Sequence, residues 1–159
     1  MSEKTIAQSL KPPVDHALIL IHRFILECPE DLWGAVTGGY TAWQHVAHAI
    51  SAEDFFTPGE SVPKPKNVTD DELHLKRTGT SAVSKDEITA YFEAVRKKVS
   101  GFIDSLEDKD LAAVNEATSK AVKLDWTIAH TLALLAAHPL YHLGYLDALL
   151  KNNGHKTIF

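Results

Sequence analysis

The spacing of hydrophobic residues along the chain predicts helices. From Val14 to Ile25 they recur every three or four positions, which is the period of one face of an α-helix. Pro12 and Pro13 suit the first turn of a helix, where the missing amide proton costs nothing. We therefore expect a first helix that begins at this proline pair and ends near Cys28.

Two further helices are predicted on either side of a long polar segment. The first runs from about Tyr40 to Phe56, and the second follows Ser84, which opens a capping box, and keeps a helical period as far as Leu106. Residues 57–83 between them contain three prolines and no sustained period. This segment is expected to be a long loop with a short helical turn after Thr69, and loops of this length often cover a site.

The last predicted helix is the most hydrophobic one. It begins near residues 125–127, where Thr127 is a possible N-cap, and ends at the sequence Asn152-Asn153-Gly154. Residues 111–121 have only a weak helical pattern. Because no segment alternates as a half-buried strand does, the chain is expected to be all-α, an up-down four-helix bundle in one domain spanning residues 1–159.

Composition and charge exclude several classes of protein. The 159 residues are 45% hydrophobic and 23% charged, which is typical of a globular domain, and the net charge is −5. The longest basic run is Arg96-Lys97-Lys98, so the sequence argues against nucleic-acid binding. Residues 128–150 are interrupted by histidines and tyrosines and are expected to be a buried helix, not a membrane span. A single cysteine and no signal-peptide pattern favour the cytoplasm.

Candidate chemistry lies in the last helix, in the sequence "HPLYHLGYL". His138 and His142 are four residues apart and therefore project from one face of the helix, together with several leucines. Such a pair fits hydrogen-bonded core histidines, a polar pocket without a metal, or two metal ligands. The second predicted helix offers His45 and His48 as a third ligand, and helical phase does not choose between them.

Three stretches together give the chain a resemblance to a known family. "AHAISAEDFF" in the second helix, "SLEDKDL" after the third and "HPLYHLG" in the last resemble the DinB-like (DinB/YfiT) proteins in order and separation. The resemblance covers nearly the whole chain. The sequence departs from the family at Tyr145, where the family often has a glutamine after the glycine.

The resemblance implies a divalent metal bound by three histidines. By match to the family motif, His48 is the first ligand, with Glu53 five residues after it, and His138 and His142 are the other two. Three imidazoles suit Zn²⁺, Ni²⁺, Fe²⁺ or Cu²⁺ and leave positions open for water or substrate, unless His45 or Asp54 completes the shell.

The resemblance also suggests activities and partners. Relatives include metal-dependent transferases that use low-molecular-weight thiols, so a thiol or another small molecule is the expected ligand, and homodimers are common in the family. Two alternatives stay open: a noncatalytic protein that binds a metal or small ligand in a stress response, and a bundle whose histidines are structural.

The remaining histidines and the cysteine give no comparable signal. His130 is expected at the side of its helix, and the others are expected on the surface or in loops: His16, His22, His74 and His155. Cys28 has no base paired with it in any motif, so it is expected to be a small packing residue.

Overall fold

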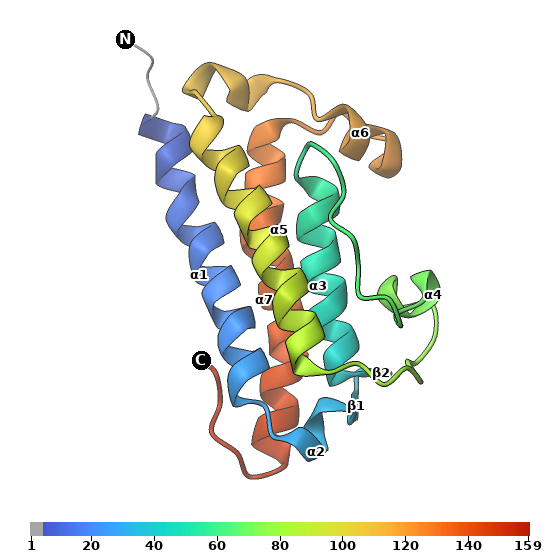
Figure 1. The fold of residues 1–159 in the computed structure, drawn as a ribbon. Helices are drawn as coiled ribbons and strands as arrows, with labels where there is room; N and C mark the ends of the chain where they lie inside the picture. The colour runs from blue at the N-terminus through green and yellow to red at the C-terminus, as the bar shows by residue number, and fades with distance from the viewer. Residues whose placement is uncertain (1–4) are drawn as a thin grey trace.

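Four long helices lie side by side and confirm the predicted all-α bundle (Figure 1). The computed structural model describes residues 5–159. The long helices are α1 (Thr5–Glu27), α3 (Ala42–Phe56), α5 (Lys85–Ser105) and α7 (Ile128–Asn152). Helices α1 and α3 each pack against both α5 and α7, so the hydrophobic side chains of all four fill one core.

The directions of the helices do not simply alternate. Along α3 and α5, Ser51 pairs with Tyr91 and Asp54 pairs with Lys98, so these two neighbouring helices run the same way. The segment that joins them must cross the length of the bundle, as Figure 1 shows in green. This crossing carries the segment past the outer side of α3.

Helix α1 begins earlier than its sequence suggests. The backbone is helical from Thr5 onward, so the prediction that the proline pair at positions 12 and 13 begins the helix is wrong. The Asp108 carboxylate accepts the N–H groups of Ile6 (3.0 Å) and Ala7 (2.9 Å) and thereby caps the free donors of this end. A side chain far away in the sequence stabilises the additional helical turns.

The other helix ends agree with the capping signals in the sequence. Ser84 caps α5 by accepting the Glu87 N–H group, and Thr127 caps α7 by accepting the N–H group of His130. The short turn predicted after Thr69 is α4 (Asp70–Leu73). The weakly helical region contains η1 (Asp108–Ala112), a 3₁₀ helix, and α6 (Glu116–Val122).

A small hairpin precedes α3. After the short helix α2 (Glu30–Trp33), the strands β1 (Val36–Thr37) and β2 (Tyr40–Thr41) pair antiparallel across Gly38 and Gly39, whose φ angles are 57° and 91°. Strands of two residues are too short to show an alternating pattern, so the sequence did not indicate them.

The buried carboxylate of Glu72 fixes the second half of the long segment. It accepts N–H groups from Thr69, Thr80 and Ser81 and hydroxyl groups from Thr69 and Ser81, at 2.8–3.1 Å. Burial alone would raise its pKa, but these hydrogen bonds outweigh burial and lower the pKa to about 2. The Gln44 amide donates to the backbone carbonyl of Glu72 and so ties this half of the segment to α3.

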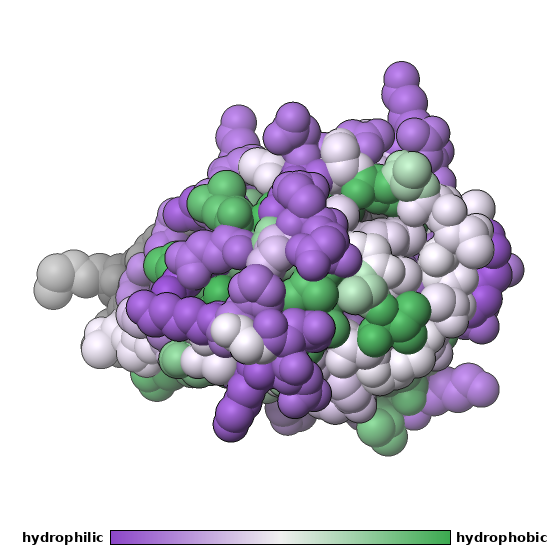
Figure 2. Space-filling model, turned by 90° about the horizontal axis from the view of Figure 1, so that it is seen from below, coloured by the Kyte–Doolittle hydropathy of each residue, from purple (hydrophilic) through white to green (hydrophobic). Residues whose placement is uncertain are grey.

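One end of the bundle, which carries α2, is shown in Figure 2. Hydrophilic residues cover much of this face, and hydrophobic residues form separate patches on it. This face therefore offers no continuous hydrophobic surface that would mark the expected dimer interface.

Candidate metal centre

Four histidines from α3 and α7 meet between the two helices. His45 and His48 lie on α3, and His138 and His142 lie on α7. His45 and His142 are each only 2% exposed. The ring centroids of His48, His138 and His142 are 4.8–5.3 Å apart, and those of His45 and His142 are 5.4 Å apart.

Three of these histidines are arranged as a metal site would require. His48, His138 and His142 each offer a ring nitrogen, and the three nitrogens lie within 4.8 Å of one another. The Nε2 atoms of His138 and His142 are 3.3 Å apart. Two nitrogens bound tetrahedrally to one Zn²⁺ at about 2.05 Å would be about 3.3 Å apart. The donor set therefore fits a divalent metal, and the structure brings the three predicted ligands together.

The loop between α3 and α5 orients the imidazole of His48. Its Nδ1 lies 2.9 Å from the carbonyl oxygen of Leu73, at the end of α4. A carbonyl can only accept, so Nδ1 carries the proton and Nε2 keeps its lone pair. Such a hydrogen bond is the usual outer support of a metal-binding histidine.

His45 and Asp54 do not complete the shell with a fourth protein ligand. The two ring nitrogens of His45 contact the Thr37 carbonyl (2.8 Å) and His142 Nδ1 (3.1 Å). The carboxylate of Asp54 binds Lys98 at 2.7 Å and accepts the N–H group of Val62. A metal held by the three histidines would keep open positions.

His138 differs from the other two histidines of the triad. Its Nδ1 is buried and has no hydrogen-bond partner among the described residues. Phe56 packs edge-on against its ring, with the centroids 6.5 Å apart. Within residues 5–159, no polar group outside the site therefore fixes its tautomer.

Burial keeps all four imidazoles neutral near pH 7. It lowers the pKa of His142 to about 3 and of His138 to about 4, and neighbouring histidines add to both shifts. Burial also lowers the pKa of His45 and of His48, against hydrogen bonds to backbone carbonyls that raise them. Neutral imidazole is the form that has a lone pair for a metal.

A pocket of about 190 Å³ opens beside His48 and His138. Its other walls are Ser51, Ala52, Phe55, Phe56, His74 and Leu134. None of these lining residues carries a permanent charge, and most are hydrophobic. The pocket therefore suits a small, uncharged group next to the triad.

His74 is a residue of this pocket that the sequence did not indicate. It follows α4, and its Nδ1 lies 2.8 Å from the carbonyl oxygen of Asp70, which leaves Nε2 as its available nitrogen. The residue lies in a segment without helical period, so no spacing argument relates it to the triad. Only the crossing of this segment over α3 brings it to the pocket.

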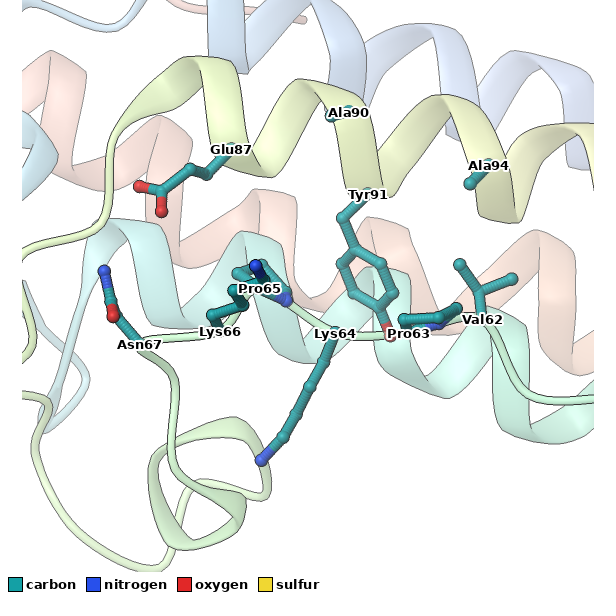
Figure 3. Close-up of a pocket in the computed structure, with 10 residues that line it drawn as sticks. All are labelled: Val62, Pro63, Lys64, Pro65, Lys66, Asn67, Glu87, Ala90, Tyr91 and Ala94. Atoms are coloured by element: carbon teal, nitrogen blue, oxygen red, sulfur yellow. The ribbon is translucent and has the colours of Figure 1, made fainter.

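A larger hollow of about 460 Å³ lies elsewhere, between residues 62–67 and α5 (Figure 3). The ring of Tyr91 extends from α5 to this segment, and Lys64 points away from the helix. The ten lining residues include no histidine or cysteine and none of the residues around the triad. This hollow is separate from the candidate metal centre.

Comparison with known proteins identifies the family. A family model described as the DinB superfamily matches residues 19–146, which is most of the chain. The chain belongs to the DinB superfamily. The match confirms the resemblance seen in the sequence, and the DinB match includes all three histidines of the triad. No curated protein and no solved structure matches this DinB chain.

The other residues considered in the sequence lie outside the centre. His130 is exposed near the start of α7, as expected for a residue at the side of the helix. Cys28 is buried, and burial raises the pKa of its thiol to about 11, which suits a packing residue better than a nucleophile. Among residues 5–159, no helix is both long enough and hydrophobic enough to cross a membrane.

Proposed function

We propose that this DinB protein binds a divalent transition metal through His48, His138 and His142 and acts as a transferase with a low-molecular-weight thiol, or as a related hydrolase. One observation carries the proposal: three imidazole nitrogens lie within 4.8 Å of one another beside a pocket. Zn²⁺, Ni²⁺ and Fe²⁺ are the candidate ions, since all of them accept nitrogen ligands.

The charge of the site favours an anionic reactant. All three ligands are neutral, and no carboxylate belongs to the group, so a divalent ion would keep its full charge of +2. When bound, such an ion would lower the pKa of a thiol or a water molecule that occupies an open position. The neutral ligand set is thus consistent with a thiolate or hydroxide nucleophile.

The lining of the pocket supports a proposal for the chemical class of the second reactant. Phe55, Phe56 and Leu134 give it hydrophobic walls, while His74 and Ser51 are its polar groups. A small, uncharged electrophile fits this lining. In the transfer, the thiol sulfur bonds to the electrophilic carbon and the leaving group departs with the electron pair of the broken bond. The proton of the thiol passes to solvent or to Nε2 of His74.

A noncatalytic binding protein is the second candidate. The pocket has no carboxylate among its lining residues, and beyond the two triad histidines His74 is the only lining side chain that could serve as a general acid or base. A protein that stores or senses a metal or a small ligand needs no more than this.

Metal analysis of protein purified without a metal-affinity tag tests both candidates. We expect about one transition-metal ion per chain in the parent and in His130→Ala, and none in the His138→Ala, His142→Ala double variant. Assays with a panel of thiols and small electrophiles then separate the candidates, because only a transferase turns them over. If the parent stays free of metal after incubation with Zn²⁺ or Ni²⁺, the transferase and a metal-binding role are both wrong, and the second candidate keeps only its small-ligand form.

A further inference from the structure

A chain of hydrogen bonds joins the hairpin before α3 to one of the three triad histidines. It runs from the carbonyl oxygen of Thr37 to His45 Nε2 (2.8 Å) and from His45 Nδ1 to His142 Nδ1 (3.1 Å). His45 is 2% exposed, and both of its partners are uncharged. A charged imidazole buried in these surroundings would be costly, so His45 is neutral and carries one proton.

The acceptor at the start of this chain of hydrogen bonds determines which ring nitrogen carries the proton in His45 and in His142. The Thr37 carbonyl can only accept, so the single proton of His45 lies on Nε2. Nδ1 of His45 then has a lone pair, and the contact with His142 is a hydrogen bond only if His142 Nδ1 donates. The neutral His142 consequently has no proton on Nε2, the atom that lies 3.3 Å from Nε2 of His138.

We propose that His45 is a positioning residue that holds the proton of His142 on Nδ1 and so presents the Nε2 lone pair to the metal. The proposal rests on the metal site of the proposed function, but it concerns a residue that is not itself a ligand. His48 receives the equivalent support directly from a backbone carbonyl, whereas His142 receives it through a second imidazole.

The surroundings of His45 hold its ring in the required orientation. Tyr145 stacks on the ring with the centroids 5.1 Å apart and the planes at 17°, and Tyr40 packs edge-on at 6.0 Å. The hydroxyl of Thr37 donates to the backbone carbonyl of Tyr145 at 3.3 Å, which ties the hairpin to α7. Thus the acceptor at the start of the chain and the ring in its middle are fixed to the same helix as His142.

The decisive measurement is the tautomer of His142 in metal-free protein labelled with ¹⁵N-histidine. Two-bond ¹⁵N–¹H correlations near pH 7 should show the proton of His142 on Nδ1. In His45→Phe, which keeps an aromatic ring but has no acceptor, the proton should move to Nε2. His45→Asn places an amide oxygen near the position of Nδ1 and should keep the proton of His142 on Nδ1.

Metal affinity supplies a second readout without any assay of turnover. In competition with a chelator, His45→Phe should bind Zn²⁺ about 10- to 100-fold more weakly than the parent. His45→Asn should recover most of this loss, and His22→Phe, whose ring stacks on Phe92 away from the triad, should bind Zn²⁺ as the parent does.

The two readouts keep this proposal distinct from the proposed function. A proton on Nε2 of His142 in the parent, or unchanged tautomer and affinity in His45→Phe, would overturn the role of His45. The parent spectrum alone can overturn the role of His45, even if His45→Phe does not fold. A parent with its proton on Nδ1 that binds no Zn²⁺ would instead refute the metal site while leaving the hydrogen-bond chain intact.

Discussion

Replacing Glu53 is expected to stabilise the protein, and the gain should grow as the pH rises. The side chain lies on α3, is 1% exposed, and neither carboxyl oxygen has a hydrogen-bond partner among the described residues. Burial raises the pKa of Glu53 well above its ordinary value of 4.5. The folded protein therefore keeps this carboxyl protonated at a pH where the unfolded chain ionises it.

The size of the effect follows from proton linkage. Above pH 4.5 unfolding releases the proton of Glu53, so the free energy of unfolding falls by about 1.4 kcal/mol per pH unit until the pH reaches the raised pKa. Glu53→Gln cannot ionise and should lack this dependence. Glu53→Met also removes buried polar atoms without partners, which should add about 1–3 kcal/mol of stability at every pH.

Urea unfolding between pH 5 and pH 8 would measure these differences, with the fluorescence of the buried Trp33 and Trp43 as the signal. Subtracting the parent from Glu53→Gln cancels all other titrating groups. Parallel stability curves for the two proteins over this range would refute the raised pKa of Glu53. A Glu53→Met variant that is less stable than the parent at every pH would show that the carboxyl has a partner.

Three further substitutions test the framework around the site. Lys98→Met leaves the carboxylate of Asp54, which is only 8% exposed, without its cation. Urea unfolding should show that the free energy of unfolding falls by about 3–5 kcal/mol. Adding Asp54→Leu should recover part of this loss. Glu72→Gln should cost about 1–3 kcal/mol near pH 6, since an amide accepts fewer hydrogen bonds. Thermal unfolding should show that the parent loses this advantage over Glu72→Gln as the pH falls from 4.5 toward 2. The lowered pKa of Glu72 is about 2, so the carboxylate becomes protonated in this range. Gly38→Ala would place a Cβ 2.6 Å from ring atoms of Tyr145, at a φ of 57° that disfavours any side chain. The free energy of unfolding should fall by about 1–3 kcal/mol in thermal unfolding. Competition with a chelator should show a weaker affinity for Zn²⁺.

The parts of the fold that the sequence predicted depend on local signals. Ser84 and Thr127 cap helices through residues three positions later, so a short stretch of sequence contains both partners. The start of α1 depends instead on Asp108, more than a hundred positions away from Ile6. The fastening of the long segment depends on Gln44 and Glu72, which are also distant in sequence.

The residues of the candidate site also differ in whether a local signal in the sequence predicts them. The common face of His138 and His142 follows from helical geometry, so their spacing alone predicted that they point together. Helical phase could not separate His45 from His48, and the family resemblance was needed to favour His48. The structure gives the physical reason: both nitrogens of His45 are already occupied, by Thr37 and His142, whereas those of His48 include one free to face the triad.

Tyr145, which stands where the family often has a glutamine, packs against His45 in the structure. The ring of Tyr145 covers one face of His45 and lies so close to Gly38 that no side chain fits at that glycine. A glutamine at position 145 has no ring to stack on the imidazole and would leave space beside the hairpin. Tyr145, Gly38 and His45 therefore depend on one another, and the support of His142 belongs to this combination of residues more than to the triad itself.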